Sequence, residues 1–216
     1  MTGEESTGHP IVAAIYDPLT APFDDRLLGE HREYLAADLS GSVLDLGSGT
    51  GAMFPHFATA EPSESPSPTF HAIEPDPYMR RRAQSRANDL DLPIDIRPDP
   101  AESLPYEDDS MSVVIASLVL CTIPDVEAAL GEVARVLEPG GEFRVLEHVA
   151  AEGWSGHLQT AVNPVWKRAA AGCHLDRDTE ATLRAHDRFA VQELTTLEMG
   201  VPPVKPFIRG TLEVRE

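Results

Sequence analysis

Lysine, cysteine and long apolar runs are the scarce features of this sequence. Lysine occurs only at Lys167 and Lys205 among 17 basic residues, whereas 36 acidic residues give the chain a formal net charge of -19. Because nucleic-acid binding depends on basic side chains that neutralise phosphates, DNA and RNA are excluded as expected partners. No apolar run approaches the roughly 18 residues of a membrane-spanning helix, so we expect no stable membrane insertion.

The two cysteines and the first residues indicate where the protein works. Cys121 and Cys173 are too few for a disulfide framework and favour a reducing compartment. The first ten residues, MTGEESTGHP, do not have the pattern of a signal peptide, so a cytoplasmic location is predicted. An acidic, lysine-poor surface also suits a cytosol of high salt, in which screening weakens the repulsion between carboxylates, and it predicts a halophilic protein.

The glycine-rich stretch VLDLGSGTG at 43–51 is the strongest functional signal in the chain. Gly47, Gly49 and Gly51 follow a short apolar strand and allow a ligand to approach the main chain closely. A dinucleotide-binding loop has the spacing G-x-G-x-x-G, and Asp45 would repel its pyrophosphate. A carboxylate here suits a cationic ligand, and S-adenosylmethionine carries a sulfonium and an ammonium group but no phosphate. We therefore predict S-adenosylmethionine as the cofactor, and a dehydrogenase is the least expected alternative.

The apolar pattern predicts one α/β domain over residues 1–216, with residues 1–15 loose and a Pro/Ser surface loop at 61–69. Short apolar runs alternate with amphipathic segments, which is typical of a doubly wound, mostly parallel sheet. Pro75 is expected as a first helical residue, and the Pro-Gly-Gly at 139–141 is expected to end a helix. The predicted strands span 43–46, 70–74, 94–97, the first half of 111–120, and 143–148, followed by a hairpin of 189–197 and 207–215. The predicted helices span 22–39, the residues around 53–57, 75–88, 124–137, 155–171 and 178–187.

This order of elements, together with the glycine loop, resembles the class I S-adenosylmethionine-dependent methyltransferases over essentially the whole chain. The resemblance implies a Rossmann-like sheet of seven strands whose last strand is antiparallel, which would fit the C-terminal hairpin. A narrower similarity is found in SLVLCTIPDVEAALGEVARVLEPGGEFRVLEHVA at 117–150 and in NPVWKRAAAGCHLDRDT at 163–179. These segments look like the methyltransferase-like thiol S-methyltransferases of animals. The resemblance does not extend to the apolar N-terminal membrane anchor that those proteins carry.

Ligands of open α/β sheets bind beyond the carboxyl ends of the strands, beside the first strand. Glu74 ends the second predicted strand and is expected to accept hydrogen bonds from both ribose hydroxyls. Ala101 and Glu102 resemble the segment of the family that contacts the adenine edge. Ser117 and Leu118 are expected close to the methyl donor. The predicted cofactor site consists of Asp45, Gly47, Ser48, Gly49, Gly51, Glu74, Pro75, Ala101, Glu102, Ser117 and Leu118.

Methyl transfer needs little from protein side chains, because the sulfonium is an activated leaving group and alignment supplies much of the acceleration. For a thiol acceptor the attacking species is the thiolate, so a nearby base would help. His148, which follows Glu147 at the end of the fifth predicted strand, is the candidate catalytic base. His174 is a weaker candidate, Trp166 could line the acceptor pocket, and Cys121 is expected to be a buried small hydrophobe. Zincin-like paired histidines and CxxC spacing are absent from the sequence, so no metal is predicted.

The leading functional hypothesis is S-methylation of a thiol, with a small-molecule methyl acceptor as the partner. N-methylation of a phospholipid head group and C-methylation of a quinone precursor stay open, because those enzymes share the same core motifs. A non-enzymatic alternative is an S-adenosylmethionine-binding module without turnover. The sequence specifies neither the acceptor nor the oligomeric state.

Overall fold

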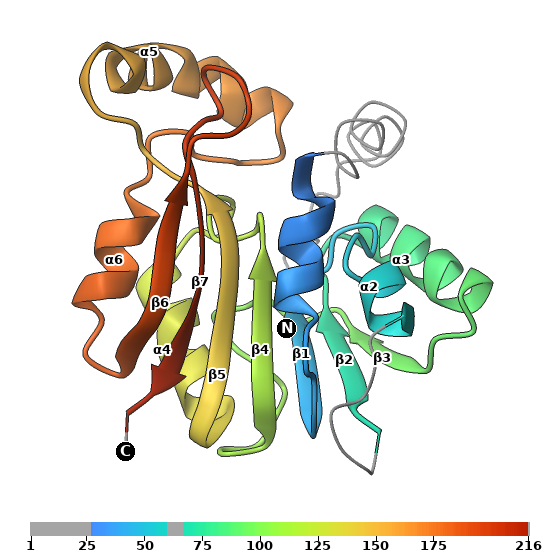
Figure 1. Cartoon of the computed structure of the whole chain (residues 1–216). Helices are drawn as coiled ribbons and strands as arrows, with labels where there is room; N and C mark the ends of the chain where they lie inside the picture. Colours follow the sequence, from blue (N-terminus) through green and yellow to red (C-terminus); the bar gives the residue numbers. More distant parts are fainter. Residues whose placement is uncertain (1–26, 60–66, 216) are drawn as a thin grey trace, which may run out of the picture.

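The computed structural model describes residues 27–59 and 67–215, which form a seven-stranded sheet flanked by helices (Figure 1). The strands are β1 (Ser42–Leu46), β2 (Thr69–Ile73), β3 (Ile94–Arg97), β4 (Met111–Ser117), β5 (Leu137–His148), β6 (Phe189–Leu197) and β7 (Phe207–Val214). Their order in the sheet is β3-β2-β1-β4-β5-β7-β6. β7 runs antiparallel to β5 and β6, and the other neighbouring strands are parallel. The predicted doubly wound fold with an antiparallel C-terminal hairpin is confirmed.

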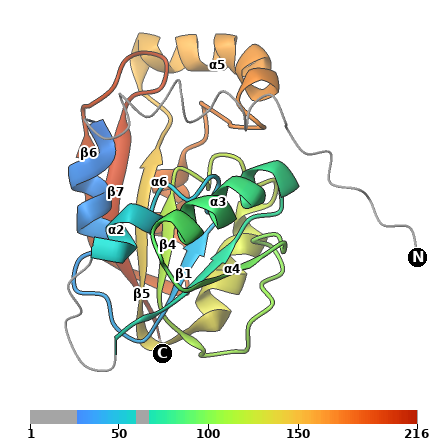
Figure 2. The same ribbon diagram turned by 90° about the vertical axis from the view of Figure 1, so that its right-hand side faces the viewer.

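Helices cover both faces of this sheet (Figure 2). They are a helix at 27–35, α2 (Phe54–Thr59), α3 (Pro77–Asp89), α4 (Val126–Val136), α5 (Gly153–Ala169) and α6 (Thr179–Ala185). The helix at 27–35, α2 and α3 share one core cluster, to which Leu35 and Phe54 belong. α4 and α6 share the other cluster through Leu130 and Leu183. β1 and β4 lie between these layers, which is why they are buried at almost every position.

The helix predicted to begin at Pro75 begins at Pro77 instead. Asp76 is its N-cap, and its side chain accepts hydrogen bonds from the N–H groups of Tyr78 and Met79. Pro77 then occupies the first helical position, where a missing N–H costs nothing. The capping aspartate therefore decides which of the two prolines starts the helix.

The predicted helix at 22–39 is too long within the part that the structure describes. It ends at residue 35, and residues 36–38 form a turn in which Asp38 has a positive φ of 50°. Thr69 begins β2 rather than ending the Pro/Ser loop. The predictions for residues 1–15, for the start of this helix at 22–26, and for 61–66 lie outside the described residues.

The Pro-Gly-Gly at 139–141 was predicted to end a helix, but α4 has already ended at Val136. The next residue, Leu137, adopts an extended conformation and pairs with Met111, so 139–141 fall within β5. The pairing of β4 with β5 is irregular here, between Met111 and Val113. The predicted helix at 124–137 thus ends almost where α4 does, but the Pro-Gly-Gly lies within β5 and does not terminate the helix.

α5 lies across the end of the sheet at which β4 and β5 finish (Figure 1). Gln159 holds it there, with its side chain fully buried. The amide nitrogen of Gln159 donates to the carbonyls of Val149, Pro203 and Lys205, and its oxygen accepts the N–H of Ala151 at 2.6 Å. This helix is thus fixed to the sheet by a polar anchor.

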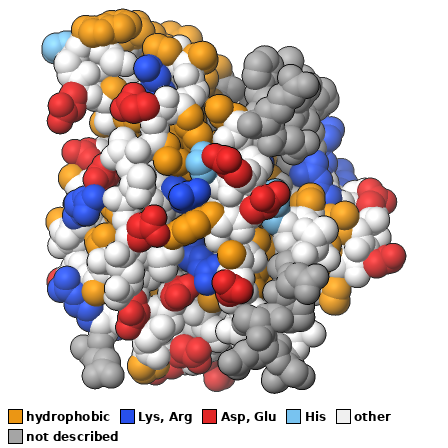
Figure 3. All heavy atoms as spheres, in the orientation of Figure 1, with side chains coloured by type: hydrophobic (Ala, Val, Ile, Leu, Met, Phe, Trp, Pro, Cys, Tyr) orange, Lys and Arg blue, Asp and Glu red, His pale blue; other side chains and the backbone are white. Residues whose placement is uncertain are grey.

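Hydrophobic side chains gather on the outside of the molecule over α5 (Figure 3). Trp154 is 73% exposed and Val165 is 69% exposed. Within residues 27–59 and 67–215, no helix combines the length and the apolarity that crossing a bilayer requires. The apolar side chains of α5 are therefore a feature of the protein surface.

Candidate active site

The glycine loop follows β1 and presents its main chain at the carboxyl end of the sheet. Gly47 has a φ of 63°, and a side chain at this position would overlap Val119, which follows β4. Gly49 has a φ of 58°, but a Cβ added there would meet no atom within 4 Å. The N–H of Gly51 donates to the carbonyl of Ser48 at 2.8 Å and closes the turn. Gly47 therefore serves packing, whereas Gly49 leaves open the space that a ligand pressed against the main chain needs.

Glu74 comes directly after β2 and is only 8% exposed. Its Oε2 accepts the N–H of Gly49 at 2.8 Å, and its Oε1 accepts the N–H of Asp76 at 2.8 Å. Burial raises the pKa of Glu74, although these two hydrogen bonds oppose the increase. Each carboxylate oxygen has a second lone pair, so Glu74 retains the capacity to accept two hydroxyl groups. Its role toward a ribose stays a prediction, but the same carboxylate clearly holds the glycine loop.

Buried polar atoms without a hydrogen-bond partner occur at the carboxyl ends of three adjacent strands. They include Oδ2 of Asp45 and Oγ of Ser48 at β1, Oγ of Ser117 at β4, and Oε2 of Glu147 at β5. Native proteins leave few buried polar atoms unpaired. Several such atoms at the carboxyl ends of neighbouring strands indicate a site for a polar ligand.

Asp45 lies inside β1 and is 1% exposed. Burial raises the pKa of this carboxyl to about 7, with Arg32 acting to lower the pKa and Glu74 adding to the increase. A cation bound nearby would stabilise the ionised form. This arrangement suits the cationic ligand that the sequence predicted for Asp45.

The chain turns sharply at the end of β4. Leu118 has a φ of 58°, a left-handed conformation that costs a residue with a side chain about 1–2 kcal/mol. The turn directs the N–H groups of Val119 and Leu120 to Oε1 of Glu147, at 2.5 and 2.7 Å. Glu147 is fully buried, and burial raises its pKa to about 7. Backbone strain held in place by a buried carboxylate is typical of a functional site.

The remaining predicted cofactor residues lie at the same end of the sheet. Ala101 is buried in the main core cluster, and Oε1 of Glu102 accepts the N–H of Asp125 at 3.3 Å, at the start of α4. Pro75 lies between β2 and α3, where its carbonyl accepts a hydrogen bond from Arg80. The contacts of Pro75, Ala101 and Glu102 with the cofactor stay predictions.

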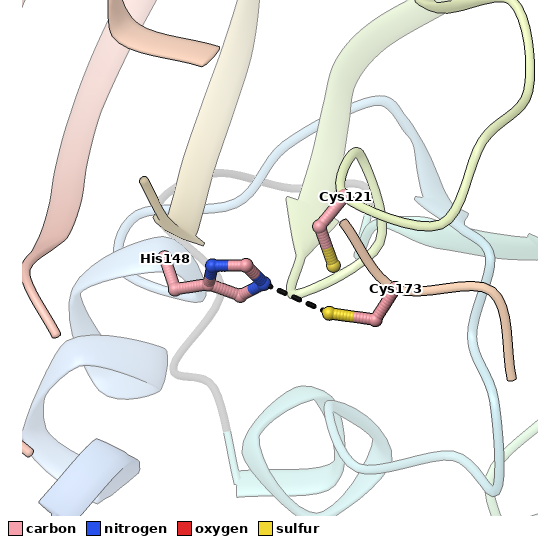
Figure 4. A group of neighbouring side chains, drawn as sticks. All are labelled: Cys121, His148 and Cys173. Atoms are coloured by element: carbon pink, nitrogen blue, oxygen red, sulfur yellow. Dashed lines mark hydrogen bonds between the residues drawn. The ribbon is translucent and has the colours of Figure 1, made fainter. Parts of the chain in front are cut away.

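His148, the predicted catalytic base, lies in a cluster with both cysteines of the chain (Figure 4). Its Nε2 is 3.0 Å from Sγ of Cys173. One donor atom from each of Cys121, His148 and Cys173 lies within 4.8 Å of the others. All three side chains are buried, with exposures of 3%, 4% and 9%. The three residues come from the turn after β4, the end of β5 and the segment between α5 and α6.

The charges of this cluster are linked. The neighbouring thiol of Cys121 lowers the pKa of Cys173, and His148 lowers it further. The same contact raises the pKa of Cys121, and burial adds to this increase. Burial disfavours the charged form of His148, yet its hydrogen bond to Cys173 raises the pKa of the imidazole overall. The protonation of Cys173 is therefore coupled to that of His148.

Backbone contacts hold the second cysteine against the first. The N–H of His174 donates to the carbonyl of Cys121 at 2.9 Å. Arg177 donates to the carbonyl of Ile123 at 2.8 Å, and its own carbonyl accepts the N–H of Ala150 at 3.0 Å. The segment between α5 and α6 is thus tied to the chain after β4 and to the chain after β5.

Sequence reasoning missed part of this cluster. Cys121 is buried as predicted, but it is not surrounded by apolar atoms alone, because Cys173 and His148 adjoin it. Trp166 lies close enough to Cys173 to help lower the pKa of the thiol. His174 joins the cluster only through its backbone, and burial lowers the pKa of its side chain. Cys173 had no local signal, because its partners are 52 and 25 residues away in sequence, as their residue numbers show.

Comparison with known proteins identifies the family to which this chain is related. Residues 44–145 match a family described as a methyltransferase domain. Human thiol S-methyltransferase TMT1A is 30% identical over 205 residues, which cover 91% of this chain and 80% of that protein. Rat thiol S-methyltransferase TMT1B is 31% identical over 201 residues, which cover 87% and 77%. The structure of YcgJ from Bacillus subtilis is similar with a TM-score of 0.66 at 19% identity, covering 88% of this chain and 98% of that chain.

The fold and the glycine loop with its carboxylates define a class I, Rossmann-like methyltransferase. This chain belongs to the methyltransferase family that includes the thiol S-methyltransferases TMT1A and TMT1B. The predicted enzyme class and the predicted cofactor, S-adenosylmethionine, are confirmed. The residues also fit this cofactor, because Gly49 leaves open space beside the buried carboxylate of Glu74, and Asp45 offers a second buried carboxylate in the strand before the loop.

Proposed function

We propose that this methyltransferase transfers a methyl group to the sulfur of a small thiol. The observation that carries the proposal is the similarity, at 30% and 31% identity over most of the chain, to two thiol S-methyltransferases. The buried pair of His148 and Cys173 gives separate support, because it is a polar site beside the ends of β4 and β5 in which a sulfur could be held.

The cofactor, when bound, supplies a methyl group already activated by a sulfonium. The protein supplies alignment, because correct orientation of the reacting groups accounts for much of the barrier reduction in such transfers. Gly49 leaves room for a ligand at the main chain, Glu74 offers carboxylate oxygens to hydroxyl groups, and Asp45 offers a buried negative charge to a cation. The row of unpaired buried oxygens completes a setting that is polar and buried.

The acceptor must lose a proton before its sulfur becomes a good nucleophile. His148 is the residue that we propose to assist this step, acting within its cluster with Cys121 and Cys173. Arg177, which is tied to the chain after β4, adds a positive charge near the cluster. A positive field favours a thiolate over a thiol.

We further propose that the enzyme works on small molecules in the cytoplasm of a cell with high internal salt. A net charge of -19 and only two lysines support this setting, because screening by salt removes the repulsion between the 36 acidic side chains. The same charge disfavours nucleic acid as an acceptor.

A panel of acceptors with isotope-labelled S-adenosylmethionine tests the proposal. Alkyl thiols, primary amines and phenols are offered separately to the wild type and to Gly49→Val, which blocks the open space beside the loop. We expect labelled thioethers from the wild type and at least tenfold less product from the variant. Product from amines or phenols but not from thiols would refute the proposal that the methyl acceptor is a thiol. Binding of the cofactor without product from any acceptor would favour a binding module instead.

A further inference from the structure

Two sulfur atoms and one imidazole nitrogen meet in a buried cluster outside the glycine loop and its carboxylates. From this cluster we propose a metal site: Cys121, His148 and Cys173 bind one Zn²⁺ ion and leave one coordination position open for the acceptor thiol. Cysteine and histidine are the ligands that zinc prefers, and three protein ligands with one open position are typical of its catalytic sites.

The geometry of the cluster is close to that of a zinc site. With Zn–S bonds of about 2.3 Å and Zn–N bonds of about 2.0–2.1 Å, donor atoms on a tetrahedral ion are roughly 3.5–3.8 Å apart. Nε2 of His148 is 3.0 Å from Sγ of Cys173, and one donor atom from each residue lies within 4.8 Å of the others. The distance of 3.0 Å is shorter than the separation of donor atoms on a tetrahedral ion, and the limit of 4.8 Å is longer. Side-chain adjustments of less than about 1 Å would bring the three donors onto one ion.

The backbone around the cluster is already fixed, so the ligands are organised in advance. The N–H of His174 is bonded to the carbonyl of Cys121, and Arg177 joins the segment of Cys173 to the chain after β4. Nε2 of His148 faces Sγ of Cys173 and is the ring nitrogen placed to bind the metal, whereas Nδ1 is buried on the other side of the ring (Figure 4).

The open position gives the metal a role in catalysis, and this part of the inference rests on the proposed thiol acceptor. The acceptor thiol binds through sulfur and releases its proton to solvent, since a thiol that coordinates zinc is deprotonated. The thiolate sulfur then forms a bond to the methyl carbon. The bond between that carbon and the sulfonium breaks, and its electron pair stays on the departing sulfur. The product is a neutral thioether, which is a weaker ligand than a thiolate and dissociates.

This site defines how His148 assists deprotonation: it acts as a ligand of the metal and not as a free base. The prediction of no metal was based on ligand spacing within short motifs. Here the ligands come from three separate segments, at positions 121, 148 and 173, so no short motif reveals them.

Zinc titration of the reduced, metal-free full-length chain tests the site, with a chromophoric zinc chelator as competitor. The variants are Cys121→Ser, His148→Gln and Cys173→Ser, and His157→Gln is the matched control because His157 is exposed on α5 outside the cluster. We expect one zinc per chain in the wild type and the control. Each cluster variant should bind zinc at least about 100-fold more weakly, since even loss of a residue that only supports a ligand costs 10–100-fold. Affinity for S-adenosylmethionine, measured by calorimetry, shows that the variants are folded.

The proposal is overturned if the wild type binds no zinc, if the folded variants bind zinc as the control does, or if the cysteines only form a disulfide. Rates of methylation of ethanethiol by the zinc-loaded and metal-free protein separate this inference from the proposed function. We expect the zinc-loaded form to be at least tenfold faster. Equal rates would refute the catalytic role of the metal and leave S-methylation standing. Zinc binding without methylation of any thiol would refute the proposed acceptor and leave the metal site standing.

Discussion

Asp45 provides a prediction about how cofactor affinity depends on pH. Burial raises the pKa of its carboxyl to about 7, against an ordinary value of 3.8, with a lowering effect from Arg32 and a further increase from Glu74. At pH 5 the free protein therefore carries a proton on Asp45. A bound cation favours the ionised carboxylate, so binding of S-adenosylmethionine should release this proton.

The size of the effect follows from the pKa. If Asp45 must ionise in the complex, affinity at pH 5 should be about 50-fold weaker than at pH 7, because each pKa unit corresponds to about 1.4 kcal/mol. Calorimetric titrations at pH 5, 6 and 7, in buffers of different ionisation enthalpy, measure both the affinity and the protons released. Asp45→Asn is the control, because the amide is similar in size and cannot titrate. Glu74 is present in both proteins, so the difference between their profiles reports the ionisation of Asp45 together with its coupling to Glu74.

The same proton should affect folding, with the opposite dependence on pH. Between pH 3.8 and about 7 the folded protein binds more protons at Asp45 than the unfolded chain does, so the free energy of unfolding should fall as pH rises through this window. Asp45→Asn should remove that part of the pH dependence. Profiles of affinity and stability that are equally steep in the wild type and the variant would refute a role for the ionisation of Asp45.

Three further predictions concern the loop and the surface. Gly49→Val should lower cofactor affinity at least tenfold, whereas Gly140→Val should leave it unchanged. Gly140 is the matched control because both glycines have a positive φ and open space at the added Cβ. Equal affinities of the two variants by calorimetry would remove Gly49 from the site. Glu74→Ala should weaken cofactor binding by about 1.5–3 kcal/mol for each charged hydrogen bond that the ligand loses, and wild-type affinity would exclude Glu74 as a contact. The melting temperature should rise between roughly 0.1 M and roughly 2 M potassium chloride, because the Debye length is already only about 3 Å at 1 M. An unchanged melting temperature would contradict the halophilic interpretation of the net charge.

The fold was predictable because its signals are local. The apolar run in β4 and the three- and four-residue spacing of apolar side chains in α4 each report burial by neighbouring layers. Element ends were harder to predict, since they depend on individual side chains. Asp76 moves the start of α3 from Pro75 to Pro77, and the extended Leu137 ends α4 before the Pro-Gly-Gly.

The glycine loop that we assign to the cofactor was recognisable in the sequence, because its glycines and Asp45 are close together and Glu74 directly follows the next strand. Other features depend on tertiary contacts. The hydrogen bond from Gly49 to Glu74 and the strained Leu118 held over Glu147 have no sequence signature. Cys173 reaches His148 only because the segment between α5 and α6 folds back over the end of β5.

The identity of the atom that receives the methyl group tests the central claim most directly. Incubation with 2-aminoethanethiol and labelled S-adenosylmethionine offers the enzyme a thiol and an amine in one small molecule, so access and binding are the same for both groups. Mass spectrometry with fragmentation then locates the label. Thiol S-methylation predicts the label on sulfur, with the amine unmodified. Label on nitrogen, with the sulfur free, would contradict it.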